Sequence, residues 1–144
     1  MIGNVLWMVL SFNFAAVCFA QTKSGQACLS YEPTVVKLQG TLARKTYPGP
    51  PNYEDVRKGD RPESSWFVVL SHPVCVDEDK ESPDLNPAHQ NIRSVQLVLT
   101  QEAYKKYKGL IGKRVIATGT LFGEHTGHHH TPVLLIVGRM EQKK

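Results

Sequence analysis

The sequence contains no internal repeat and no low-complexity tract, which excludes solenoids and other repeat architectures. It has no nucleophile elbow, no Cys/His pair arranged for nucleophilic catalysis and no His-Glu-x-x-His motif. The formal net charge of +4 over 144 residues is modest and does not by itself indicate a nucleic-acid partner. The length indicates one domain, and the missing motifs favour a function other than catalysis.

Charged residues are absent from Ile2–Ala20, which is rich in Leu, Val, Phe, Ala and Met. Small residues at Cys18 and Ala20 precede polar Gln21, so residues 1–20 are predicted to be a signal peptide cleaved after Ala20. The usual basic residue near Met1 is missing, which leaves an uncleaved membrane anchor as one alternative. A lipoprotein signal at Cys18 is another. The predicted mature domain, residues 21–144, is periplasmic or secreted and has no membrane span.

Cysteine is scarce, and only Cys28 and Cys75 remain after the predicted cleavage. An even number of cysteines in an exported chain predicts a disulfide between them. Closing a loop of that length stabilises a fold by about 4 kcal/mol in the chain-entropy model. Two buried thiols are the alternative, and a two-cysteine metal site is disfavoured because no Cys-x-x-Cys spacing is present.

Alternating apolar and polar residues predict five strands and one short helix. In Val35–Thr46, the apolar face includes Gly40, whose position within a strand indicates a bulge or a bend. Thr100 is a suitable N-cap for the helix, and Gly109 is a suitable end. The predicted elements are strands at Val35–Thr46, Ser65–Val76, Ile92–Leu99, Lys113–Phe122 and Val133–Met140, and a helix at Gln101–Lys108.

The order of these elements is that of an OB-fold. The fold class predicted is therefore mainly β, a five-stranded OB-fold-like barrel with one short helix between strands three and four. Strand one should pair with strands two and four. Ligands of this fold meet strands two and three and the loops after strands one and four. In this chain those loops are Tyr47–Pro62, predicted to be ordered, and Gly123–Thr131.

The Gly123–Thr131 loop holds four of the six histidines, at His125 and His128–His130, beside Glu124. Imidazoles in a loop can hydrogen-bond the backbone, contact a ligand or bind a metal. His125, His128 and His130 can supply three ligands to zinc or another transition metal, with Glu124, His72 or His89 as a fourth. A metal-dependent hydrolase is the enzymatic version of this alternative, with Glu54, Asp60 and Glu63 as further carboxylates.

Several segments resemble a bacterial family of exported proteins classed as a domain of unknown function. The resemblance implies a periplasmic or secreted protein and brings no established activity. The segments that carry it best are Cys28-Leu-Ser-Tyr-Glu-Pro33, Pro48-Gly-Pro-Pro-Asn-Tyr-Glu54 and Thr126-Gly-His-His-His-Thr-Pro-Val-Leu-Leu135.

The two loops together predict a binding site at one end of the barrel, for a small polar ligand or for a peptide or protein partner. No cofactor is required, although zinc fits the metal alternative. Nucleic acid is disfavoured because the cationic residues are spread along the chain and are densest on the helix. The predicted site residues are Tyr53, Glu54, Trp66, His125, His128 and His130.

Export and the disulfide are tested together by intact mass. Protein recovered from the exported fraction should have the mass of a chain that begins at Gln21 and lacks two hydrogens. Free thiols detected under denaturing conditions would show that the disulfide is absent.

Overall fold

The strands and the helix lie where the alternation places them, with ends shifted by at most a few residues. The computed structural model describes residues 27–144, so the predicted signal peptide and its cleavage site lie outside the described residues. The regular elements are β1 (Val35–Pro48), η1 (Val56–Lys58), β2 (Pro62–Val76), β3 (His89–Val98), α1 (Gln101–Tyr107), η2 (Lys108–Leu110), β4 (Arg114–Gly123) and β5 (Val133–Gln142).

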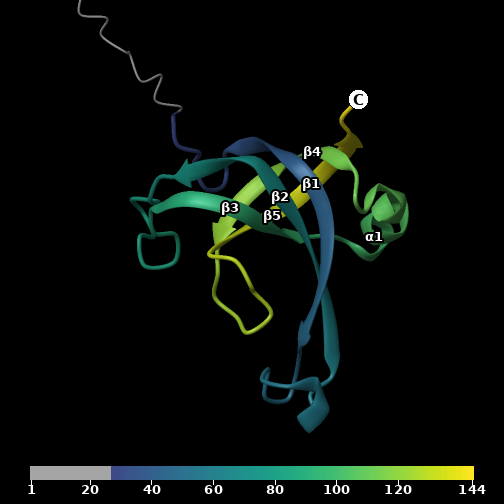
Figure 1. The fold of residues 1–144 in the computed structure, drawn as a ribbon. Helices are drawn as coiled ribbons and strands as arrows, with labels where there is room; N and C mark the ends of the chain where they lie inside the picture. Colours follow the sequence, from purple (N-terminus) through teal and green to yellow (C-terminus); the bar gives the residue numbers. More distant parts are fainter. Residues whose placement is uncertain (1–26) are drawn as a thin grey trace, which may run out of the picture.

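The five strands form one sheet that closes into a ring in the order β1-β2-β3-β5-β4, with β4 paired back to β1 (Figure 1). All neighbours are antiparallel except β3 and β5, which pair in parallel. The predicted pairing of the first strand with the second and the fourth is confirmed. The helix lies between β3 and β4 in the chain, also as predicted.

The first strand closes the ring because it pairs with two neighbours along its length. Residues 35–41 pair with β4, and residues 40–48 pair with β2. Gly40 belongs to both registers, and a Cβ there would overlap the carbonyl oxygen of Val69. Gly119 on β4 is in a similar position, against the carbonyl oxygen of Ile136. Only glycine allows the strands to approach so closely at these two points.

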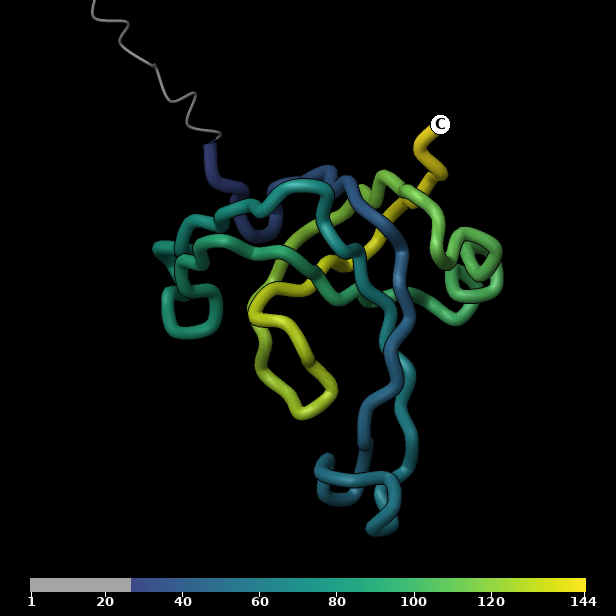
Figure 2. Tube along the Cα trace, viewed as in Figure 1, coloured from purple at the N-terminus to yellow at the C-terminus, as the bar shows by residue number. Residues whose placement is uncertain are grey.

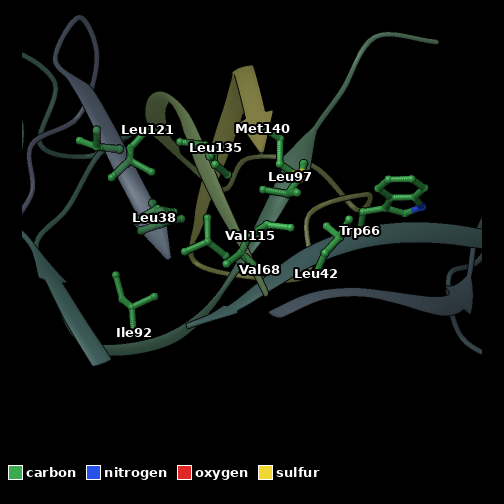
Figure 3. Close-up of a cluster of buried hydrophobic side chains, with 14 of the residues drawn as sticks. Leu38, Leu42, Trp66, Val68, Ile92, Leu97, Val115, Leu121, Leu135 and Met140 are labelled. Carbon is green, nitrogen blue, oxygen red and sulfur yellow. The ribbon is translucent and has the colours of Figure 1, made fainter. Parts of the chain in front are cut away.

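The hydrophobic core fills the inside of the ring (Figure 3). Inward residues of β4 alternate strictly with outward ones, as the sequence predicts. Trp66 lies at the margin of this cluster, where its ring meets Tyr104 of α1 edge-on at 5.0 Å. Labelled members of the cluster include Leu38, Leu42, Val68, Ile92, Leu97, Val115, Leu121, Leu135 and Met140.

The predicted disulfide joins Cys28 to Cys75. Beside it, the backbone N–H of Leu29 donates to the Cys75 carbonyl at 2.8 Å, and that of Asp77 donates to the Leu29 carbonyl at 2.9 Å. The start of the described chain is therefore fixed to the end of β2. Among residues 27–144, no helix has the length and apolar character that crossing a membrane requires.

Two segments extend from the ring on the same side (Figure 2). One is the arm formed by the ends of β1 and β2 and the loop that joins them. The other is the connection between β4 and β5, residues 124–132, which we call the histidine strap. Both belong to the two loops that the sequence singles out.

Replacing Gly119 by alanine should lower the free energy of unfolding by about 3 kcal/mol, because its Cβ would displace the paired strand β5. Gly109→Ala is the matched control. A Cβ at Gly109 meets open space, so this variant should change the stability by less than about 0.5 kcal/mol. Chemical denaturation of both variants measures the difference, and equal stabilities would contradict the close approach.

Candidate functional site

The histidine strap lies over the outer face of the sheet, along one row of cross-strand neighbours. The registers align Phe67 of β2 with Gln96 of β3, Gln96 with Leu134 of β5, and Leu134 with Phe122 of β4. Phe67 and Leu134 are fully buried, yet neither belongs to the core cluster inside the ring. The strap therefore covers a second, smaller apolar layer on the outside of the sheet.

The side chain of Gln96 holds the middle of the strap. Its amide Nε2 donates to the carbonyl oxygen of His128 at 2.8 Å, and its Oε1 accepts from the backbone N–H of His130 at 2.6 Å. The backbone N–H of Gln96 donates to Oγ1 of Thr131 at 3.0 Å, and that hydroxyl donates to the Val133 carbonyl at 2.7 Å. Gln96 is only 6% exposed, so its polar atoms depend on these partners.

His125 and His129 hold the end of the strap next to β4. Their rings pack on Phe122 at centroid distances of 5.7 and 5.5 Å. The backbone N–H of His125 donates to Nδ1 of His129 at 3.0 Å, so the His129 ring is neutral and carries its proton on Nε2. His125 Nδ1 lies 3.1 Å from the Gly123 carbonyl, to which its N–H donates.

His130 is a packing residue rather than an exposed ligand. Its ring stacks on Tyr47 at 3.8 Å with an interplanar angle of 10°, and Tyr47 in turn contacts Phe67 at 5.9 Å. Its Nε2 is buried without a hydrogen-bond partner. Burial lowers the pKa of both His129 and His130, because removal from water disfavours the charged imidazolium.

His128 connects the strap to the tip of the arm through hydrogen bonds. Its Nδ1–H donates to both carboxylate oxygens of Glu63, at 2.7 and 2.8 Å. Its Nε2 accepts from the Tyr53 hydroxyl at 3.1 Å, and the two rings meet edge-on at 5.3 Å. Tyr53 has φ of 60°, a left-handed conformation that is strained for a large side chain. The Glu63 carboxylate, the His128 imidazole and the Tyr53 hydroxyl thus form a hydrogen-bonded chain. A proton can move within this chain between Tyr53 and His128.

The Tyr47–Pro62 loop is ordered, as the sequence predicts, and the structure shows that one carboxylate organises it. Asp60 is 3% exposed and accepts hydrogen bonds from the backbone N–H groups of Asn52, Glu54 and Asp55, at 2.8, 2.7 and 2.9 Å. The bonds from Asn52 and Glu54 are the main reason that the pKa of Asp60 is lowered. This turn presents Tyr53 to the strap.

A hollow of about 290 Å³ lies beside the His128 contacts, lined by Pro50, Arg61, Pro62, Glu63 and His128. It combines one guanidinium, one carboxylate and one imidazole with the flat faces of two prolines. The imidazole side chain is half exposed, and that of Glu63 is 30% exposed. Polar groups that are already oriented by one another therefore remain accessible to a ligand.

The predicted site residues are only partly brought together. Tyr53 and His128 are in contact, and His130, two residues further along the strap, stacks on Tyr47. Glu54 contributes its backbone N–H to Asp60, whereas its side chain is exposed. Trp66 is 6% exposed and faces α1 on the opposite side of β2, so it does not join the predicted ligand-binding residues.

The three histidines predicted as metal ligands do not converge. His125 is bonded to Gly123, His128 to Glu63 and Tyr53, and His130 is stacked on Tyr47. Within residues 27–144, no three His, Cys, Asp or Glu side chains are grouped in a way that could hold a metal ion. These imidazoles are held apart because each one contacts a different part of the chain.

Two residues outside the predicted site set are central to the arrangement. Glu63 was noted in the sequence only as one of several carboxylates that can meet the histidines. Gln96 gives no signal, because a polar residue between Val95 and Leu97 has the pattern of a solvent-facing position. The structure instead buries Gln96 under the strap.

A family model described as a domain of unknown function (DUF4431) matches residues 94–141. The match supports a relation to a family of uncharacterised domains. The matched range runs from within β3 through α1 and β4 into β5, and so includes the whole strap and Gln96. It does not include β1, β2 or the Tyr47–Pro62 loop. The comparisons with curated proteins and with solved structures gave no match.

The lowered pKa values of His129 and His130 predict a stability that depends on pH. Both folded-state values lie below 6.5, so their contribution is complete above pH 6.5 and is lost as the pH falls through the folded values. The free energy of unfolding should therefore decline between about pH 7 and about pH 5. His129→Gln and His130→Phe should each reduce this decline, as measured by denaturation at both pH values.

This window is separate from that of Asp55 and Asp60. Their lowered pKa values contribute stability that is complete above 3.8 and is lost only at more acidic pH. If the free energy of unfolding declines below pH 6.5 by the same amount in both histidine variants as in the unchanged protein, the strap imidazoles are not the source of the decline.

Proposed function

We propose that the closed sheet is an OB-fold and that the chain is an exported binding module, with its site where the arm meets the histidine strap. The strand order, the parallel pairing of β3 with β5 and the position of α1 support this fold assignment. The disulfide supports an oxidising compartment, periplasmic or extracellular.

The contact of His128 with both Tyr53 and Glu63 carries the proposal. Tyr53 lies within the Tyr47–Pro62 loop and Glu63 follows that loop on β2, whereas His128 belongs to the other loop on which ligands of this fold depend. Tyr53 is held in a strained backbone conformation at this contact. Such strain persists where the surrounding structure enforces it, and it is concentrated at functional sites.

The hollow beside this contact indicates the class of ligand. Arg61 offers hydrogen-bond donors to a carboxylate, and Glu63 keeps unused acceptor positions for an ammonium or amide group. The prolines supply flat apolar contact. A short peptide, or a small polar molecule with both donor and acceptor ends, therefore fits better than a long polyanion.

NMR titration with a panel of short peptides whose side chains are uncharged tests this proposal. Peptides with free termini should shift the backbone signals of Tyr53, Arg61 and His128. Forms with acetylated or amidated ends should bind more weakly if the charged ends are recognised. Glu63→Gln or His128→Ala should weaken binding about tenfold or more, the effect of losing one charge-assisted hydrogen bond.

Glu81→Gln is the matched control, since it neutralises an exposed carboxylate on the 77–88 loop. It should bind as the unchanged protein does. His128→Ala should also keep nearly the same melting temperature, because the His128 side chain is half exposed. A peptide whose binding is unaffected by both site variants, or a large fall in melting temperature without loss of binding, would refute the proposal.

A further inference from the structure

A second surface is independent of the proposed binding site and lies on α1 and the turn after it. We call Lys105–Arg114 the basic turn. It contains five cationic residues and no acidic one, and the next acidic residue in the chain is Glu124. All five cationic side chains are exposed. The cations are Lys105, Lys106, Lys108, Lys113 and Arg114.

The C-terminus enlarges this positive surface. The backbone N–H of Lys143 donates to the Arg114 carbonyl at 2.9 Å, which places Lys143 and Lys144 beside the basic turn. Within residues 27–144, the ion pairs made by lysine or arginine are Arg57 with Asp55 and Arg139 with Glu141. None of the seven cations of this surface is paired, so their charge is available to a partner.

The basic turn is held rigidly on the sheet. The Tyr107 hydroxyl accepts from the backbone N–H of Met140 at 3.2 Å, which fixes α1 to β5. Gly112, at φ of 81°, donates its N–H to the Leu42 carbonyl at 2.7 Å. Leu42 in turn donates to the Lys113 carbonyl at 3.0 Å. The cations are thus displayed on a preformed surface rather than on a flexible tail.

Two apolar residues lie between the lysines of the basic turn. Ile111 is 36% exposed, and Leu110 beside it is partly exposed. They lie between Lys108 and Lys113, with Gly109 and Gly112 on either side, and Leu110 also packs against the core. Apolar side chains flanked by lysines suit the boundary between lipid headgroups and acyl chains.

Charge is distributed unevenly over the whole molecule. The 77–88 loop carries five acidic residues and one lysine, and it lies across the sheet from α1 and the C-terminus (Figure 1). A negatively charged surface would attract the basic turn and repel this loop. The molecule would therefore approach such a surface in one orientation.

We propose that the basic turn docks on an anionic lipid surface, with Ile111 entering the headgroup region and the surrounding lysines contacting phosphate groups. Nucleic acid fits less well. Single strands require exposed aromatic platforms, whereas Tyr104 packs on Trp66 and Tyr107 is buried. Ile111 would also face a hydrophilic backbone.

Sedimentation with lipid vesicles tests the proposal. The protein should bind vesicles made of equal parts phosphatidylcholine and phosphatidylglycerol, and not vesicles of phosphatidylcholine alone. Binding should weaken as salt is raised to about 0.15 M. Replacing Lys105, Lys106 and Lys108 together by glutamine should reduce binding about 100-fold, at about fivefold for each charge. Ile111→Ser should reduce it about threefold.

Matched controls separate this surface from general charge and general hydrophobicity. The triple variant Lys37→Gln, Lys58→Gln, Lys80→Gln removes three exposed charges elsewhere and should lose much less affinity. Leu85→Ser removes a side chain that is 63% exposed on the acidic loop and should have no effect. Every variant keeps the same N-terminus, so the apolar N-terminal segment cannot account for differences between variants.

Three outcomes would overturn the proposal. One is equal binding to neutral and anionic vesicles. A second is equal loss in the two triple lysine variants. A third is binding of a single-stranded oligonucleotide that requires Lys105, Lys106 and Lys108 while Ile111→Ser has no effect on vesicle binding. That result would replace the lipid partner by nucleic acid. None of these outcomes depends on peptide binding at His128.

Discussion

One buried carboxamide determines what the outer face of the sheet can do. Gln96 accepts from one backbone group of the strap and donates to another, so the strap cannot leave without exposing two polar groups and Gln96 itself. A buried unpaired polar group costs about 1–3 kcal/mol. The same displacement would expose Phe67 and Leu134. The strap is therefore part of the folded core, although it is a loop on the surface.

This attachment explains why the candidate site lies at the arm rather than on the open face of strands two and three. The face around Phe67 and Gln96 is already occupied by the chain's own strap. What remains accessible is the junction at which the strap meets the arm, where His128 contacts Tyr53 and Glu63. The site depends on Asp60 as well, because its three backbone hydrogen bonds shape the turn that carries Tyr53.

The elements could be predicted from the sequence because alternation and end signals are local. Thr100 does cap α1 through a bond to the Ala103 N–H at 3.2 Å, and Gly40 does mark the point where β1 changes neighbour. Which residues form the candidate site could not be predicted in the same way. Alternation placed Gln96 correctly on the outer face but could not show that the strap covers that face. Trp66 was assigned to the site by its position on strand two, whereas its ring turns inward to α1.

The imidazoles of the strap make different contacts, so protonation has different consequences from one to the next. His129 accepts a backbone hydrogen bond through Nδ1, and protonation of that atom removes the bond. His130 is stacked and partly buried, so a positive charge there would lie away from water. His128 donates to Glu63 through Nδ1 and accepts from the Tyr53 hydroxyl through Nε2. Acid therefore weakens the attachment of the strap to the sheet at His129 and His130. Histidine suits the strap because one flat ring can both pack on an aromatic neighbour and bond to the backbone or to a carboxylate.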